Sequence, residues 1–350
     1  MNIPHSKPTV GRDEVKGIQE VLASGRIATG EEVAGFEQEM AAYLGLRGGV
    51  ATASGTAALH LSLLALGVKE RDEVIIPSFT CSALLNAVHY CRATPVVVDI
   101  DKETMNISLS VTQKALSKRT AAIVVPHMFG HPVENMSDFL SFGPPLIEDC
   151  AQSLGATSQG IMTGTQGTIA MLSFYATKVI TTGHGGMVVS QNEDLLERVR
   201  DLRAYDKKME YRIRYNYCMT DMQGRMGRIQ LEKLPAFLEA RRKRAQWYEK
   251  HLSNLEGVVL PIQKGIYYRY VIKIKNGRLQ NALEQLHQNG IEAQRPVFSP
   301  LHRYLGLDGF DITEQVFSEA LSLPLYPRLT AEEVRYTARC LSSAVNDIKG

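Results

Sequence analysis

Residues 146–187 begin with LIEDCAQSLGA and end with AMLSFYATKVITTGHGGM, and a connector rich in glycine, serine and threonine separates these two parts. Each part opens with a short apolar run that ends in polar side chains. The first run is followed by Glu148 and Asp149, and the second by Ser173 and then Lys178. Short apolar runs bounded in this way are typical of buried strands. The pattern therefore predicts an acid and an amine at the ends of two strands.

The same pattern recurs through the first two thirds of the chain, where short β-branched runs alternate with helical segments. The runs that we interpret as strands are residues 74–76, 96–98, 123–125, 146–147 and 170–174. This alternation indicates an α/β fold, with a mainly parallel mixed sheet that helices cover on both faces. Ligands of such sheets bind outside the carboxyl ends of the strands, which is where the polar residues lie.

Small residues mark the start of one helix in a way that suits an anion. Residues 50–59 read VATASGTAAL and lead into an apolar helix that extends to about residue 66. The first N–H groups of a helix have no partner within it, and the helix dipole favours a negative charge there. Gly55 lets the backbone approach a phosphate, and Thr56 adds a hydroxyl. The alternative is an ordinary Ser/Thr helix cap, which the motif alone favours.

A long helical pattern divides the chain. Helical spacing of apolar residues persists from residue 221 to about 252, which is long enough to bridge two domains. The segments after it have strand-like or helical patterns: residues 267–274, 279–289 and 330–348. We therefore expect a large domain with an N-terminal helical segment at residues 1–240 and a small C-terminal α+β domain at residues 241–350.

Composition excludes several other classes of protein. The 39 basic and 37 acidic residues give a net charge of +2, which provides no reason to propose nucleic acid or an anionic membrane as a partner. The N-terminus lacks an apolar segment of signal-peptide length, and no apolar stretch is long enough to span a bilayer. The five cysteines and nine histidines are scattered, so we expect neither disulfides nor a metal site. A cytoplasmic enzyme is the simplest expectation.

The polar residues of the opening stretch suit one kind of cofactor chemistry. A lysine can form a Schiff base with pyridoxal phosphate and then act as a general acid and base, as Lys178 would. A carboxylate such as Asp149 keeps the pyridine nitrogen protonated, so that the ring accepts electrons. Ser173 offers a hydroxyl to the phosphate, and Gln152 can contact the ring. The alternatives are a solvated lysine and a helix-capping aspartate.

Many ordered motifs together resemble the DegT/DnrJ/StrS family of sugar aminotransferases, which are fold type I pyridoxal-phosphate-dependent enzymes of the aspartate aminotransferase superfamily. The motifs that carry the resemblance cover nearly the whole chain and lie at residues 54–59, 72–80, 95–101, 148–156, 173–174, 177–178, 180–183, 215–217, 219–221 and 322–325. Lysine at position 178 matches the aminotransferase branch, because the sugar-dehydrating relatives have histidine there.

The resemblance implies a role for each site residue. Lys178 would carry the cofactor as a covalent aldimine and shuttle protons, and Asp149 would pair with the pyridine nitrogen. Gln152 would contact the ring. The remaining cofactor-binding positions are Gly55, Thr56, Ala57 and Ser173 at the phosphate, Phe79 and Cys81 near the ring, and Asn216, which would reach the phosphate in the other subunit. The resemblance thus implies a homodimer with shared active sites.

Three positions depart from the family pattern. His184 replaces a frequent glutamate, and Cys218 replaces a frequent arginine. Cys81 stands where many members have an aromatic residue that stacks on the ring, and Phe79 is the alternative stacking residue.

The expected reaction is transfer of an amino group, with glutamate as donor, to a nucleotide-linked keto-sugar in surface polysaccharide or antibiotic sugar biosynthesis. The basic residues that could meet the diphosphate or the donor carboxylate are Arg269, Arg295 and His302. Two alternatives remain: a cyclitol aminotransferase of the aminoglycoside type, and a regulator that binds the cofactor without turnover.

Overall fold

The computed structural model describes residues 1–262 and 265–346. Its centre is a seven-stranded sheet with the strand order β1-β9-β8-β5-β4-β2-β3. The strands are β1 (Gly48–Thr52), β2 (Glu73–Pro77), β3 (Thr94–Val98), β4 (Thr120–Pro126), β5 (Leu146–Asp149), β8 (Ile169–Ser173) and β9 (Gly186–Ser190). Six of them are parallel, and β9 runs antiparallel to both of its neighbours. The expected α/β class is confirmed.

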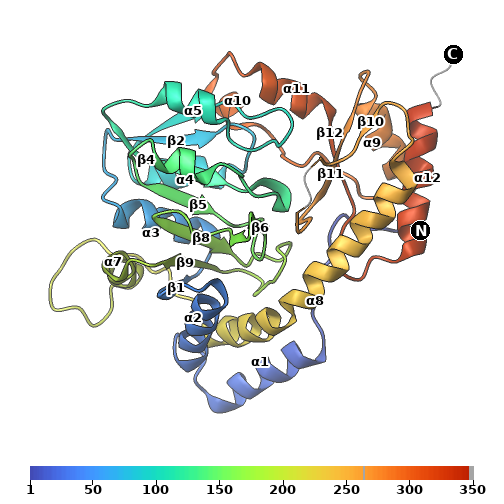
Figure 1. The fold of residues 1–350 in the computed structure, drawn as a ribbon. Coiled ribbons are helices and arrows are strands. Elements are labelled where there is room, and N and C mark those ends of the chain that lie inside the picture. The colour runs from blue at the N-terminus through green and yellow to red at the C-terminus, as the bar shows by residue number, and fades with distance from the viewer. Residues whose placement is uncertain (263–264, 347–350) are drawn as a thin grey trace.

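Helices cover both faces of this sheet, because its strands carry apolar side chains on alternate sides. One face packs against α3 (Gly55–Ala65), α4 (Ala83–Tyr90) and α7 (Glu193–Arg203). The opposite face packs against α2 (Glu31–Leu44) and α8 (Asp221–Leu252) at the β1 side, and against α5 (Leu109–Ala115) and α6 (Met136–Leu140) at the β3 side. The result is a three-layer arrangement (Figure 1).

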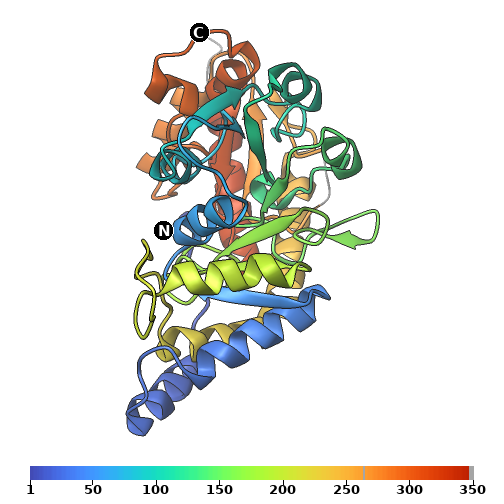
Figure 2. The same ribbon diagram turned by 90° about the vertical axis from the view of Figure 1, so that its left-hand side faces the viewer.

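Helix α8 links this sheet to a second, smaller group of elements. It begins with a capping box between Thr220 and Gln223. Its first part packs against α1 (Arg12–Ser24) and α2, and its last part packs against α12 (Ala331–Asn346). Figure 1 shows it running along the molecule from α2 to α12, and Figure 2 shows the blue N-terminal helices and the red C-terminal elements at opposite ends.

The smaller group has its own sheet and its own apolar core. Its strands are β10 (Val258–Val259), β11 (Tyr270–Ile274) and β12 (Ala320–Leu323), and its remaining helices are α9 (Leu279–Gln288), α10 (Leu301–Leu305) and α11 (Asp311–Glu319). Ile3 pairs with Ile291, so the extreme N-terminus also lies in this core. The division into domains at residues 240 and 241 stays a proposal, and that boundary falls within α8.

The sequence located most of these elements but not all of their ends. Helix α8 has the expected bounds, whereas the strand expected at 267–274 begins only at Tyr270. The final helix ends at Asn346 in the part of the chain that the structure describes, and residues 347–348 of the expected helix lie outside it. The hairpin of β6 (Thr157–Ser158) and β7 (Ile161–Met162), the 3-10 turn η1 (Met128–Gly130) and β1, α5, α10, α11 and β12 were not predicted. Across residues 1–262 and 265–346, no helix is both long and apolar enough to cross a membrane.

Candidate active site

A cavity of about 400 Å³ lies where the carboxyl ends of β5 and β8 meet the start of α3. Seven of the expected cofactor-binding residues line it: Gly55, Thr56, Cys81, Asp149, Gln152, Ser173 and Lys178. They come from four separate parts of the chain, and the parallel sheet brings them together because its strand ends share one edge.

The start of α3 forms an anion-binding cradle with Ser173. The Ser54 side chain caps the helix by accepting a hydrogen bond from the Ala57 amide at 3.1 Å. The amides of Gly55 and Thr56 make no hydrogen bond within the described chain. A β-carbon at Gly55 would lie only 3.0 Å from the Ser173 hydroxyl oxygen, so the two segments touch. Two free amides and two hydroxyls therefore surround one small space.

Asp149 is buried at the base of the cavity, with 7% of its surface exposed. Its Oδ1 accepts a hydrogen bond from the Ala151 amide at 2.9 Å. Burial raises the pKa of Asp149, and the positive charge of Lys178 opposes that rise only partly. A cation next to this carboxylate would relieve the cost of burying its charge.

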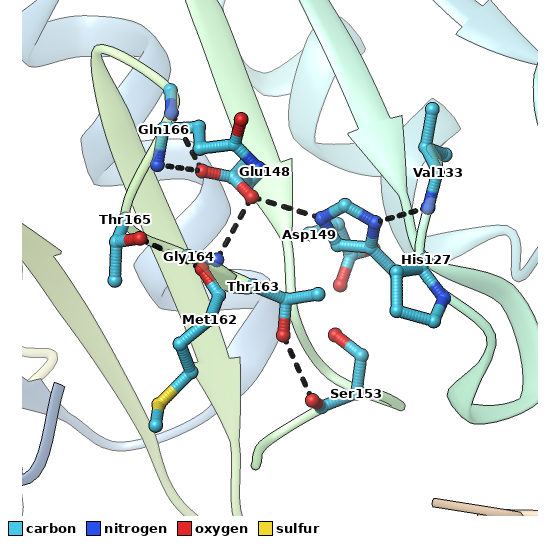
Figure 3. Close-up of polar contacts among 12 residues, drawn as sticks. His127, Val133, Glu148, Asp149, Ser153, Met162, Thr163, Gly164, Thr165 and Gln166 are labelled. Atoms are coloured by element: carbon cyan, nitrogen blue, oxygen red, sulfur yellow. Dashed lines mark hydrogen bonds and ion pairs between the residues drawn. The ribbon is translucent and has the colours of Figure 1, made fainter. Parts of the chain in front are cut away.

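Glu148 points away from the cavity, because consecutive side chains of a strand lie on opposite sides. Its carboxylate accepts hydrogen bonds from the amides of Gly164, Gln166 and Gly167 at 2.8, 2.7 and 2.6 Å, and lies 3.0 Å from His127 Nε2 (Figure 3). His127 Nδ1 accepts from the Val133 amide at 3.0 Å, so the ring proton must be on Nε2 and is donated to Glu148. Glu148 thus fastens a loop behind the strand that carries Asp149.

The cluster of His127, Glu148 and Cys150 has the spacing of a metal site. Both ring nitrogens and both carboxylate oxygens already take part in hydrogen bonds. We therefore interpret the cluster as structural.

Lys178 follows β8 in a turn, where its amide donates to the Tyr175 carbonyl at 2.8 Å. Its Nζ lies 5.0 Å from the centre of the Tyr268 ring. No hydrogen bond or ion pair holds Nζ within residues 1–262 and 265–346. The amine is therefore available to the cavity.

A model of the DegT/DnrJ/EryC1/StrS aminotransferase family matches residues 8–342. The chain belongs to this family. GDP-perosamine synthase of Caulobacter vibrioides is 34% identical over 329 residues, which cover 88% of each chain. The UDP-N-acetyl-3-dehydro-alpha-D-glucosamine 3-aminotransferase of Acidithiobacillus ferrooxidans is 32% identical over 92% of this chain and 91% of that protein. DesV of S. venezuelae, solved in complex with a ketimine intermediate, has a TM-score of 0.89 and 30% identity over 95% of this chain and 94% of that one.

This aminotransferase uses pyridoxal phosphate as its cofactor, and the cavity contains the chemical groups that this cofactor requires. The cradle of Gly55, Thr56 and Ser173 fits a phosphate. Burial raises the pKa of Asp149, and a protonated ring nitrogen next to its carboxylate would offset the cost of burying the negative charge. Gln152 accepts a hydrogen bond from the Phe129 amide at 2.9 Å through Oε1, which leaves its NH₂ group free to donate.

The structure differs from the predicted residue set at two positions, and a third position is left untested. Phe79 is fully buried against Phe129 and does not line the cavity, so the expected ring contact by Phe79 is wrong. The Ala57 amide is engaged by Ser54 and is not a free phosphate donor. Asn216 is exposed and lies outside this cavity, and its contact with the cofactor of a second subunit stays a prediction.

Three residues near Lys178 received no defined role from the sequence. Tyr175 and His184 line the cavity, with their rings edge to face at 5.1 Å. His184 was visible only as a departure from the family pattern. Tyr268, 90 residues after Lys178, carries no local signal, because only the packing of the smaller group of elements brings it there.

Proposed function

We propose that this aminotransferase transfers an amino group from glutamate to the ketone of a nucleotide-linked keto-sugar, in surface polysaccharide or antibiotic sugar biosynthesis. The observation that carries the proposal is the single cavity that contains Lys178, Asp149 and the cradle at Ser173. The two relatives named above for GDP- and UDP-linked sugars support the substrate class. A cytoplasmic location, where nucleotide sugars are made, is part of the proposal.

Each residue contributes a separate step. When bound, pyridoxal phosphate supplies an electrophilic carbonyl carbon and a ring that accepts electrons. Gly55, Thr56 and Ser173 would bind its phosphate, and Asp149 would orient its ring through the nitrogen. Lys178 would attach the cofactor and would carry a proton at Nζ during the reaction. Because Asp149 is buried, water is excluded from the ion pair that its carboxylate would form with the ring nitrogen.

Glutamate as the donor is supported by the position of Arg269. Of the three basic residues considered from the sequence, His302 is bound to Ser78 and Glu314, and Arg295 donates to the Phe317 carbonyl and stacks on the Phe317 ring. Arg269 lies against Tyr268, beside Thr177, and its buried Nη1 has no partner among the described residues. We propose that Arg269 receives a donor carboxylate.

A homodimer is supported by the apolar segment that precedes Asn216. Met209 and Tyr211 are 104% and 94% exposed, and Tyr205 and Ile213 are exposed as well. These residues lie in the long loop that follows α7 at the edge of the molecule (Figure 1). A second copy of the chain would cover them and would bring Asn216 to its cofactor. Mixing inactive Lys178→Ala with Asn216→Ala should restore activity after subunit exchange, since one intact site forms. No recovery in proven hybrids would argue against shared sites.

The test of the reaction separates its two halves. Enzyme loaded with pyridoxal phosphate should lose its cofactor absorption band on addition of glutamate and regain it on addition of the correct keto-sugar. Lys178→Ala should slow the first half by at least about a hundredfold, because the general base is lost. Lys118→Ala, which alters an exposed lysine outside the cavity and outside the loop proposed for the dimer, is the matched control. Amination of a cyclitol ketone in preference to every nucleotide keto-sugar would overturn the proposed substrate class.

A further inference from the structure

Residues 265–269, here called the strap, lead into β11 of the smaller sheet and pass beside Thr177, the residue before Lys178. The strap is bound to η1: the Ile266 amide donates to the Gly130 carbonyl at 3.1 Å, and the Arg269 amide donates to the Phe129 carbonyl at 3.3 Å. A β-carbon at Gly130, whose φ is +90°, would lie 2.7 Å from the Tyr268 nitrogen. The strap therefore has little freedom to move away from η1.

Arg241 fixes the strap from the other side. This arginine of α8 is 3% exposed, and its Nη1 donates to the carbonyls of Tyr267 and Tyr268 at 3.3 and 3.1 Å. It forms no ion pair with a carboxylate in the part of the chain that the structure describes. Burying a cation without a carboxylate partner costs free energy. Because Arg241 binds only carbonyls, its contribution is to hold the strap in place.

The strap places the Tyr268 side chain against Lys178. Tyr268 is only 5% exposed, and its hydroxyl lies 3.2 Å from Thr177 Oγ1, on the residue before the lysine. Lys178 Nζ lies 5.0 Å from the ring centre, and the Arg269 guanidinium carbon lies 5.5 Å from it. Two cations thus contact one buried ring, which is the geometry of a cation–π pair.

We propose that Tyr268 is a positioning residue that holds the ammonium group of Lys178 against its ring by cation–π contact. When the Tyr268 hydroxyl loses its proton to solvent, the negative charge of the phenolate strengthens this hold on the ammonium group. The importance of this pair for turnover rests on the proposed function, in which Lys178 attaches the cofactor.

The charges around the ring favour ionisation of the Tyr268 hydroxyl. Burial by itself raises the pKa of Tyr268, but the charges of Lys178 and Arg269 and the hydrogen bond from Thr177 lower that pKa to about 8. Arg241 also faces the phenol from α8. His5 on the N-terminal segment faces Arg269, and Asp149 faces Lys178 from β5. The phenolate of Tyr268 thus forms in a pocket that carries excess positive charge.

The first experiment measures tyrosine ionisation in cofactor-free protein by ultraviolet absorption. One of the 14 tyrosines should ionise near pH 8, well below the ordinary tyrosine pKa of about 10. Tyr268→Phe should lack this step. Tyr267→Phe is the matched control, since this neighbouring strap tyrosine donates its hydroxyl to Glu249 and should keep the step. A step near pH 8 that persists in Tyr268→Phe would overturn the proposal.

The second experiment tests the coupling from the side of the lysine. Lys178→Ala removes a positive charge from the ring, so the Tyr268 ionisation should occur about one pH unit higher. This variant keeps Tyr268 and decides the question even if Tyr268→Phe fails to fold. An ionisation that does not move in Lys178→Ala would contradict the proposed contact between Lys178 and Tyr268.

Both experiments use cofactor-free protein. Failure of transamination with an intact tyrosine step would therefore refute the proposed function and leave the pairing of Tyr268 with Lys178 standing.

Discussion

Gly55 and Ser173 lie in such close contact that a β-carbon at position 55 would be 2.9 Å from the Ser173 Cβ. We expect Gly55→Ala to force these segments apart and to spoil the phosphate cradle. Overpacking of this kind costs about 1–3 kcal/mol, which corresponds to about a tenfold to hundredfold loss of cofactor affinity if the strain falls on the cradle. Absorption titration with pyridoxal phosphate measures the effect. Gly11→Ala, where the added atom comes no closer than 3.7 Å to a neighbour, is the control. Unchanged affinity in Gly55→Ala would show that the cradle lies elsewhere.

Asp149→Asn should have opposite effects on stability and on function. Burial raises the pKa of Asp149, so the folded protein holds the proton more tightly than the unfolded chain does. Stability from this group therefore falls as pH rises from about 3.9 through the folded pKa, and the loss is complete above it. Cofactor-free Asp149→Asn should resist urea better than the wild type at neutral pH, and the difference should vanish in acid.

The same Asp149→Asn variant should bind pyridoxal phosphate more weakly and lose most of the donor half-reaction, because an amide does not stabilise a protonated ring nitrogen. Asp138→Asn, which changes an exposed aspartate, serves as the control. A wild-type level of donor half-reaction in Asp149→Asn would remove this residue from the mechanism.

Glu148→Gln should destabilise the protein without altering the groups that line the cavity. Burial raises the pKa of Glu148, but hydrogen bonding and charge from His127 and amide donors at Gly164 and Gly167 lower it overall. The amide of glutamine would face these donors, and we expect a loss of about 3 kcal/mol in the free energy of unfolding. The stability from a lowered pKa is present above about pH 4.3 and is lost as pH falls through the folded pKa, so the two proteins should converge in acid.

Urea unfolding across a pH series measures this difference. Glu31→Gln, which removes one exposed ion pair with Arg26, should change stability little. Equal stability of Glu148→Gln and the wild type at neutral pH would contradict the role of Glu148 in fastening residues 164–167.

Arg241→Met should release the strap. The substitution leaves the carbonyls of Tyr267, Tyr268 and Leu325 buried without their donor. Each unsatisfied buried group costs about 1–3 kcal/mol, so a loss of at least about 3 kcal/mol is expected. Thermal unfolding provides the measurement, and Arg242→Met, which changes the exposed arginine next to it, is the control. If both variants unfold at the same temperature, Arg241 does not support the strap.

Local sequence patterns were sufficient to predict the site residues that lie on neighbouring strands and at the start of one helix. Asp149 and Ser173 follow buried strands, and parallel strands must end at one edge, so their meeting could be predicted. The fold class and the long helix α8 were also readable, because periodicity over many residues depends little on distant contacts. The ends of β11 and the two-residue strands could not be predicted, because they depend on pairing partners that the sequence does not identify.

Which side chain enters the cavity was decided by tertiary structure. Phe79 and Cys81 lie two residues apart, yet Phe79 is buried and Cys81 reaches the cavity, because Phe79 packs into an apolar cluster that contains Phe129 and Val271. The Ser54 cap likewise removes the Ala57 amide from the phosphate donors. Neither outcome follows from the motif that contains the residue.

The amino-acid sequence by itself determined the family, the cofactor and the pair of Lys178 and Asp149, because these depend on short motifs whose order along the chain is preserved. Only the tertiary structure decided what surrounds that pair. Glu148 turns away to hold a loop, and Tyr268 arrives from a distant segment to contact Lys178. The physical reason is that a motif specifies the groups that a strand end presents, whereas the charges and contacts around those groups depend on chain segments that only folding brings near.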